Sequence, residues 1–293
     1  MQGLHEFKAH TGHVLVVKFA PDNQTLISGG MDKLIQLWST RDWENLQTIP
    51  AHEKSVNCLD ISSNGKTLVS GSSDQTARIW SLPEAKLEHT LKGHKKAITA
   101  IEIDPKAALL ATASYDTTAR LWSLDQGKEK ATLKEHQKNV FSLSFDPAGE
   151  LLASGGIGSE VMIWKVPAGK LETRLDGHMQ VAGPVLFSPN VGFLLTMDGV
   201  GTLRLWDPDG WKQVWGVQIE AAGAYPLAFN PGGERIAVGV EQRVLILETE
   251  TGALLQELAL PPKGIYSLDF SPDGRLLAIA GADEKIRVWE MQP

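Results

Sequence analysis

Histidine and aspartate recur in this sequence at a spacing that could support acid–base or metal chemistry. His10, His52 and His94 each stand 22 residues before an aspartate. An imidazole beside a carboxylate can act as a catalytic dyad, and several imidazoles together can hold a metal ion. However, the pair occurs once per repeat of 42 residues. Neighbouring histidines therefore belong to different structural units and cannot converge on one ion, so we expect no catalytic residue and no metal site.

Other signatures of small-molecule chemistry are also missing from the sequence. No glycine-rich phosphate loop precedes a helix, and no nucleophile elbow is present. The histidines outside the repeated set are scattered, at positions 5, 13 and 89. We therefore expect no cofactor.

Charge and hydropathy narrow the class of partner. The net charge is −7, and no basic run is longer than Lys95-Lys96. Binding to phosphates requires clustered lysine and arginine, so nucleic acid and anionic membranes are not expected as main partners. A basic patch formed only in three dimensions stays open. No apolar run approaches the roughly 18 residues of a membrane span.

The compartment expected from the sequence is the cytoplasm. The N-terminus has no basic start followed by an apolar stretch, which a secretion signal would require. Cys58 is the only cysteine, so a disulfide framework is excluded. Its neighbours Val56 and Leu59 indicate a small buried hydrophobe rather than a nucleophile.

An internal repeat covers the whole chain. Six tryptophans each end a short strand-like segment, such as 34–38 or 286–289. They stand at positions 38, 80, 122, 164, 206 and 289, and Leu247 takes the place of the one missing from the series. An aromatic or isoleucine series runs in the same register: Phe19, Ile61, Ile103, Phe145, Phe187, Phe229 and Phe270.

The segments between these markers predict strands. They are short, rich in Val, Ile, Trp and Thr, and interrupted every 8–12 residues by Pro, Asn, Asp and Gly. Each repeat supplies about four strands, and seven repeats of 42 or 41 residues account for all 293. We therefore predict an all-β protein and a single domain over residues 1–293.

A histidine, an aspartate 22 residues later and a tryptophan six after that resemble the WD-repeat family. The resemblance implies a seven-bladed β-propeller of four-stranded antiparallel blades. Residues 4–9 match the segments that precede His52 and His94, and the chain ends just after Trp289. They are therefore expected to complete the last blade as its outer strand, which removes an exposed sheet edge.

In this family, His, Ser or Thr, Asp and Trp of one blade form a buried hydrogen-bond chain that fixes the blade. Carried over by register, the resemblance gives three complete tetrads: His10, Ser28, Asp32 and Trp38; His52, Ser70, Asp74 and Trp80; His94, Thr112, Asp116 and Trp122.

The later repeats depart from that pattern. The fourth has Gly158 and the fifth has Val200 where the aspartate should stand. The sixth lacks all four residues, and the seventh retains only Asp283 and Trp289. An aspartate at position 158 would stabilise the fourth repeat only if the backbone there accepts a side chain.

The function implied by the resemblance is a non-catalytic scaffold that binds proteins or peptides, as a monomeric propeller. Partners are expected on the face that carries the His and Asp turns, around the central channel. A regulatory module of a larger signalling assembly is the alternative, and a propeller enzyme is a further one. The positions expected at the channel mouth are Leu15, Met31, Asn57, Ser73, Thr99, Tyr115, Asn139, Phe141, Ile157, Tyr225 and Tyr266.

The positions of the tyrosines and of two tryptophans indicate which surfaces could bind a partner. All three tyrosines of the chain fall among those positions, and tyrosine is a favoured interface anchor. Packing of these side chains into the channel mouth is the alternative. Trp43 and Trp211 occupy equivalent repeat positions on the opposite face. They mark either a second contact surface or a packing role on their own strands.

Overall fold

The computed structural model describes residues 4–190, 192–219, 226–259 and 264–291, and these residues form strands and turns only. We group consecutive strands into quartets. The first quartet contains β2 (Val14–Phe19), β3 (Thr25–Gly30), β4 (Leu34–Ser39) and β5 (Asn45–Pro50). The second contains β6 (Val56–Ile61), β7 (Thr67–Ser72), β8 (Thr76–Ser81) and β9 (Lys86–Lys92). The third contains β10 (Ile98–Ile103), β11 (Leu109–Ser114), β12 (Ala119–Ser123) and β13 (Glu129–Leu133).

The remaining quartets follow in chain order. The fourth contains β14 (Val140–Phe145), β15 (Leu151–Ile157), β16 (Val161–Lys165) and β17 (Lys170–Leu175). The fifth contains β18 (Val181–Phe187), β19 (Leu194–Asp198), β20 (Thr202–Asp207) and β21 (Lys212–Gln218). The sixth contains β22 (Leu227–Phe229), β23 (Arg235–Val240), β24 (Arg243–Glu248) and β25 (Leu254–Ala259). The seventh contains β26 (Ile265–Phe270), β27 (Leu276–Gly281), β28 (Lys285–Glu290) and the N-terminal β1 (Leu4–Lys8).

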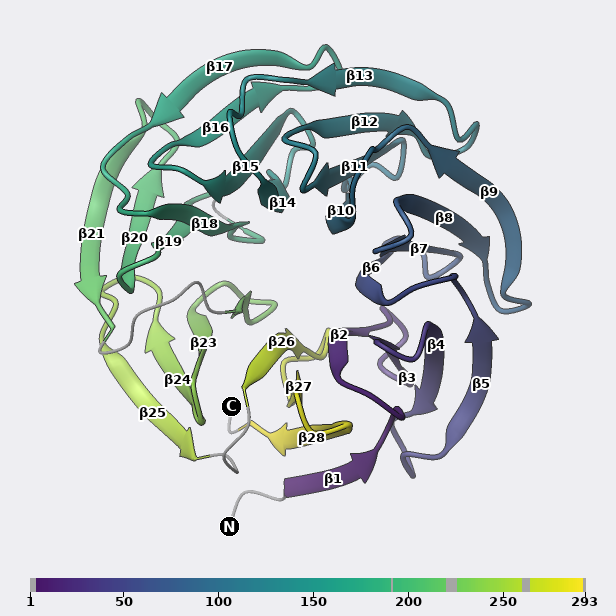
Figure 1. Ribbon diagram of the computed structural model, residues 1–293. Coiled ribbons are helices and arrows are strands. Elements are labelled where there is room, and N and C mark those ends of the chain that lie inside the picture. Colours follow the sequence, from purple (N-terminus) through teal and green to yellow (C-terminus); the bar gives the residue numbers. More distant parts are fainter. Residues whose placement is uncertain (1–3, 191, 220–225, 260–263, 292–293) are drawn as a thin grey trace.

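The quartets stand around a common centre, with the first strand of each innermost (Figure 1). Within a quartet each strand pairs antiparallel with its neighbour, as expected for strands joined by short turns. The N-terminal strand pairs with β28 from Leu4 opposite Trp289 to Lys8 opposite Lys285. The all-β propeller and its closure by the N-terminal strand, both predicted from the sequence, are thus confirmed.

One connection joins two quartets into a single sheet. Strand β15 pairs with β16 and also, through Gly156 and Ile157, with β18 of the next quartet. A Cβ on Gly155 would lie 2.2 Å from the Ala182 carbonyl oxygen, so glycine is required for this close approach. Strands β14 to β21 therefore form one eight-stranded sheet, and the count of seven separate blades stays a prediction.

The hydrophobic core lies between neighbouring quartets. One buried cluster combines Val16 and Ile27 of the first quartet with Val56 and Leu68 of the second, and similar clusters follow around the ring. Cys58 is free and buried, and burial raises the pKa of its thiol, as expected for a structural residue. In the described part of the chain, no helix is long and apolar enough to cross a bilayer.

Antiparallel topology assigns the turns to two faces. In the first five quartets, the loop that enters the innermost strand lies on the same side as the turn between the second and third strands. In the first and third quartets backbone hydrogen bonds join them, from Met31 N to His13 O (3.0 Å) and from Tyr115 N to Ala97 O (3.1 Å). We call this side the His/Asp face. The other turns lie on the opposite face.

Candidate functional site

In the first three quartets the structure brings the four tetrad side chains together. The Trp38 indole donates to Ser28 Oγ (2.9 Å), which lies 2.8 Å from His10 Nε2. His10 Nδ1 lies 2.8 Å from Asp32. The second and third quartets repeat this order, with Nδ1 to carboxylate distances of 2.9 Å for His52 and His94. A consistent set of donors requires each imidazole to carry its proton on Nδ1.

The tetrad aspartates also hold the loops of the His/Asp face. Asp74 accepts hydrogen bonds from the backbone of Glu53 (3.1 Å) and from the backbone and hydroxyl of Thr76. Burial acts to raise the pKa of Asp74, but the bonds from His52 and Thr76 outweigh it and hold that pKa well below its usual value. The carboxylate therefore ties the loop before β6 to the β7–β8 turn.

This arrangement does not expose the imidazoles to a substrate. The His10 and His52 side chains are 0% exposed and that of His94 is 1% exposed. Both ring nitrogens already have partners within the tetrads. Among the described residues, no three His, Cys, Asp or Glu side chains are grouped so as to hold a metal ion. The tetrads can therefore position loops, and their chemistry is structural.

The fourth and fifth quartets keep the inner part of the tetrad and lose the carboxylate. His136 Nε2 lies 2.7 Å from Ser154 Oγ, and His178 Nε2 lies 2.8 Å from Thr196 Oγ1. Burial, with Arg174 beside His136 and Arg204 beside His178, lowers the pKa of each imidazole to about 4. The Nδ1 atom of His178 is buried without a hydrogen-bond partner. Both histidines are therefore held neutral.

The two quartets replace the missing aspartate differently. In the fifth, the fully buried Asp198 accepts hydrogen bonds from the backbone of Val200 and Thr202 and pairs with Arg204 at 2.8 Å. In the fourth, Gly158 has a φ of +143° and donates its backbone N–H to Gln180 O of the next quartet (3.2 Å). The glycine thus occupies a conformation that an aspartate would adopt only with strain.

In the seventh quartet, the aspartate at the tetrad position has changed partner. Asp283 pairs with Arg287, whose guanidinium also pairs with Glu6 of β1 at 2.8 Å. Glu6 in addition contacts Lys285. The seventh repeat has no histidine for Asp283 to bind. Asp283 instead holds Arg287, which pairs with the N-terminal strand, and so takes part in the closure of the ring.

The structure divides the expected partner-binding positions into exposed and engaged groups. Four side chains on the His/Asp face are exposed: Met31 (49%), Tyr115 (43%), Ile157 (41%) and Tyr266 (43%). Leu15, Asn57, Ser73, Thr99, Asn139 and Phe141 are half-buried. Tyr225 lies outside the described residues.

Three half-buried polar members of that set, Asn57, Ser73 and Thr99, already have partners for their side chains inside the protein. Asn57 donates to the Ile98 carbonyl of the next quartet (2.7 Å) and exchanges hydrogen bonds with Ser73. Thr99 donates to the Val140 carbonyl (2.7 Å). These side chains join neighbouring innermost strands, so the exposed apolar residues remain as the surface most available to a partner.

A further exposed residue on this face was missed by the sequence reasoning. Met179 follows His178 directly and is 61% exposed. Its carbonyl accepts a hydrogen bond from Gly199 N (3.0 Å), which places it beside the β19–β20 turn. The sequence does distinguish this residue, because Met179 is apolar where the other repeats have Thr11, Glu53, Lys95 and Gln137. We give the name apolar cluster to Met179, Tyr115, Phe141 and Ile157, which belong to the third, fourth and fifth quartets on the same face.

Ionisable groups at the centre of the ring were also missed. Lys18 of β2 lies 3.6 Å from Asp269 of β26 and 4.0 Å from Asp60 of β6. Asp269 accepts from Phe19 N (2.7 Å) and Asp60 from Ile103 N (2.8 Å), so each carboxylate also joins two innermost strands. Burial, aided by Asp60, raises the pKa of the nearby Glu102 to about 8. The sequence feature that could have revealed these groups is their spacing, since Lys18, Asp60 and Glu102 occupy the same register position in successive repeats.

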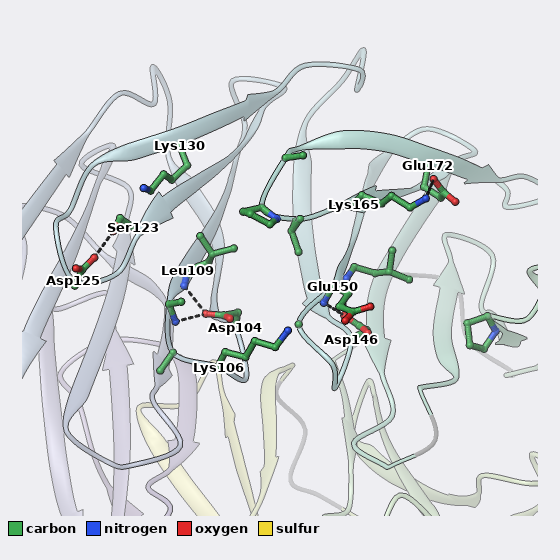
Figure 2. Close-up of a pocket in the computed structure, with 18 of the residues that line it drawn as sticks. Asp104, Lys106, Leu109, Ser123, Asp125, Lys130, Asp146, Glu150, Lys165 and Glu172 are labelled. Atoms are coloured by element: carbon green, nitrogen blue, oxygen red, sulfur yellow. Dashed lines mark hydrogen bonds and ion pairs between the residues drawn. The ribbon is translucent and has the colours of Figure 1, made fainter.

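The opposite face carries a cavity of about 1430 Å³, lined by turns of the third, fourth and fifth quartets (Figure 2). Asp104 accepts from Ala108 N (2.7 Å), Asp146 accepts from Glu150 N (2.7 Å), and Lys165 pairs with Glu172. The two aspartates build turns beside the cavity, and the ion pair joins β16 to β17.

The two tryptophans expected on the opposite face have different surroundings, and neither is fully buried. Trp211 lines the cavity and packs edge-on against Phe187. Trp43 instead stacks on His5 (5.3 Å between ring centroids) and packs near Phe7, both from β1. Trp43 therefore contributes to closure of the ring, while Trp211 borders an open surface.

Comparisons with known proteins agree with this geometry. The family described as "WD domain, G-beta repeat" matches residues 1–39, 43–81, 85–123, 127–165 and 252–290, more than half of the chain. A WD repeat-containing protein SL1-17 from Schistosoma mansoni is 33% identical over 111 residues, which is 37% of this chain and 36% of that protein.

Longer relatives match over shorter shares of their length. An intraflagellar transport protein 122 homolog from Danio rerio is 35% identical over 22% of this chain and 6% of its own. Echinoderm microtubule-associated protein-like 3 from Mus musculus is 29% identical over 35% of this chain and 12% of its own. The chain thus aligns with about a third or less of the length of these curated relatives.

Proposed function

The chain belongs to the WD-repeat family, and we propose that it is a non-catalytic interaction module that holds a protein or peptide on its His/Asp face. Proteins of this family generally serve as scaffolds for protein partners. Its relatives include an intraflagellar transport protein and a microtubule-associated protein, which support an interaction role without identifying a partner. We place the module in the cytoplasm as part of the same proposal, since its one cysteine is free.

The observation that carries the proposal is the apolar cluster. Tyr115, Ile157 and Met179 are each more than 40% exposed, and Phe141 lies 3.4 Å from the Cβ position of Gly183. Exposed apolar and aromatic side chains gathered on one face mark interaction sites. Hydrogen bonds to Asp116, Asn139 and Met179 fix the surrounding loops, so the surface is ordered before a partner binds.

The test selects peptides from a phage-displayed random library on the immobilised full chain and measures their affinities by calorimetry. We expect Tyr115→Ala and Phe141→Ala each to weaken binding by more than about 1 kcal/mol while the unfolding midpoint is retained. Leu87→Ala is the matched control, because Leu87 is also 41% exposed but lies on the outer strand β9. If the variant that combines Tyr115→Ala and Phe141→Ala binds the peptides as tightly as the parent, the proposal is contradicted. The cavity beside Trp211 is then the next candidate site.

A further inference from the structure

Lysines recur in the loops of the His/Asp face that surround the apolar cluster. Lys54, Lys96 and Lys138 occupy the same register position in the second, third and fourth quartets, and Lys95 precedes Lys96. All four are exposed. No run in the sequence is longer than two basic residues, so this patch is formed by the ring bringing three loops to one face.

The backbone carrying these lysines is fixed to the turns that carry the expected binding residues. Ser114 Oγ donates to Lys96 O (3.2 Å), and Lys95 N donates to Asp116 (2.8 Å). Asn139, next to Lys138, accepts a hydrogen bond from Ile157 N (2.9 Å). The lysine loops therefore lie directly beside the turns of Tyr115 and Ile157.

The lysines carry unneutralised charge. Within the described ranges, none of the four forms an ion pair, whereas Lys8, Lys165 and Lys285 do so elsewhere. The nearby acidic groups are otherwise engaged: Asp74 and Asp116 face their tetrad histidines. Arg174 pairs with both Glu135 and Glu160. Glu53 and Glu135 are the acidic residues on the three lysine loops, and Glu135 is the one that pairs with Arg174. A chain of net charge −7 thus presents a basic arc on this face.

We infer that the ligand of the proposed interaction site is an acidic peptide segment with an apolar anchor, the anchor on the apolar cluster and its carboxylates toward the lysines. The inference rests on the proposed function and adds the chemical class of its ligand. Complementary charge accelerates encounter and fixes orientation, while the apolar contact supplies the buried area. A short peptide fits better than nucleic acid, because a long polyanion would also meet the acidic remainder of the ring.

The experiment uses fluorescein-labelled nonapeptide pools with Leu, Ile or Phe at the centre. The flanking positions are Asp and Glu in one pool, Asn and Gln in the second, and Lys and Arg in the third. Anisotropy with the full chain is expected to rank the acidic pool first, by about tenfold over the amide pool at low salt. That advantage is expected to shrink at about 0.5 M salt, where exposed charges are screened.

Charge reversal locates the effect. Lys96→Glu with Lys138→Glu is expected to weaken binding of the acidic pool about tenfold and leave the amide pool unchanged. Lys128→Glu is the matched control, since Lys128 is exposed on the β12–β13 turn of the opposite face. An unfolding midpoint equal to that of the parent shows that the variants fold.

The outcomes separate this inference from the proposed function. Equal binding of acidic and amide pools, both lost in Tyr115→Ala, overturns the inference and leaves the interaction face in place. Acidic binding that survives the Lys96 and Lys138 reversals also overturns it. Tighter binding of a labelled oligothymidylate, lost on the same reversals, replaces the peptide by nucleic acid. If no pool and no phage-selected peptide responds to Tyr115→Ala, the proposed function itself fails.

Discussion

The first three quartets and the next two solve the same structural problem in different ways. In the first three, an aspartate binds the tetrad histidine and holds the loop of the His/Asp face within its own quartet. In the fourth, Gly158 replaces the aspartate, and β15 continues into a pairing with β18. In the fifth, Asp198 takes over the loop and leaves His178 without a partner for Nδ1.

The comparison distinguishes two roles of the tetrad residues: packing of the ring and positioning of the loops on the His/Asp face. Strands form in the fifth and sixth quartets although residues 166–251 fall outside the family match. Described residues of both quartets nevertheless pack into one core cluster, with Leu195, Ile236 and Val238 fully buried. Apolar packing between quartets therefore maintains the ring, while the histidine–aspartate pair sets the geometry of the loops.

Deletion of residues 1–9 is expected to have the largest effect. It leaves every tetrad intact, since the first begins at His10, but it removes β1 with its pairing to β28 and the packing of Phe7 against Trp38. We expect a loss of several kcal/mol and association of the exposed edge, measured by denaturant unfolding and gel filtration. A peptide of residues 1–9 added in trans is expected to restore stability. Unchanged unfolding and elution would mean that the tetrads, and not packing and closure, hold the ring.

Asp74→Ala tests the complete tetrad. It removes the carboxylate that accepts hydrogen bonds from His52, from the backbone of Glu53 and from Thr76, and each hydrogen bond to a charged group contributes about 1.5–3 kcal/mol. Asp176→Ala, in the loop before His178, is the control and is expected to leave the denaturant midpoint unchanged. An equal midpoint for Asp74→Ala would remove the tetrad from the account of stability.

Acid sensitivity tests the incomplete quartets. His136 and His178 have pKa values of about 4 when folded, below the usual 6.5, so the unfolded chain binds more protons between these values. The stability that comes from burying the two neutral imidazoles is fully present above pH 6.5. It is lost as the pH falls toward 4, by at most about 3 kcal/mol for each histidine. Unfolding free energies of the His136→Gln, His178→Gln double variant should depend less on pH in this window. An unchanged slope would contradict neutral burial.

The smallest expected effects come from attempts to restore the missing acceptor. Gly158→Asp should lower the free energy of unfolding by about 1–3 kcal/mol, because a φ of +143° strains any residue with a side chain. The strain is in the backbone, since no atom lies within 4 Å of the new Cβ. Val200→Asn has no such strain and offers His178 Nδ1 an acceptor, for a gain of about 1 kcal/mol. Val200→Ala is the control, since it provides no acceptor. Stabilisation by Gly158→Asp would show that the fourth loop accepts the ordinary turn.

The sequence predicted features set by one repeat and missed those that depend on two. Periodic Trp and Phe residues predicted the strands, because apolar alternation and turn residues act locally. Closure was predicted from the match of residues 4–9 to the outer strands of other repeats. The ion pairs of Lys18, the pairing of β15 with β18 and the cavity beside Trp211 each arise where quartets meet. The exposure of Met179 and the φ of Gly158 are properties of loop backbone, which composition does not determine.

Site-specific photo-crosslinking tests the central claim, that partners bind the apolar cluster of the His/Asp face. A benzophenone amino acid is placed at Tyr115, or at Val214, which is 50% exposed on the outer strand β21, and irradiated with a phage-selected peptide. The account predicts a peptide adduct at position 115 that unlabelled peptide competes away, and none at position 214. An adduct at position 214, with none at position 115, would contradict it.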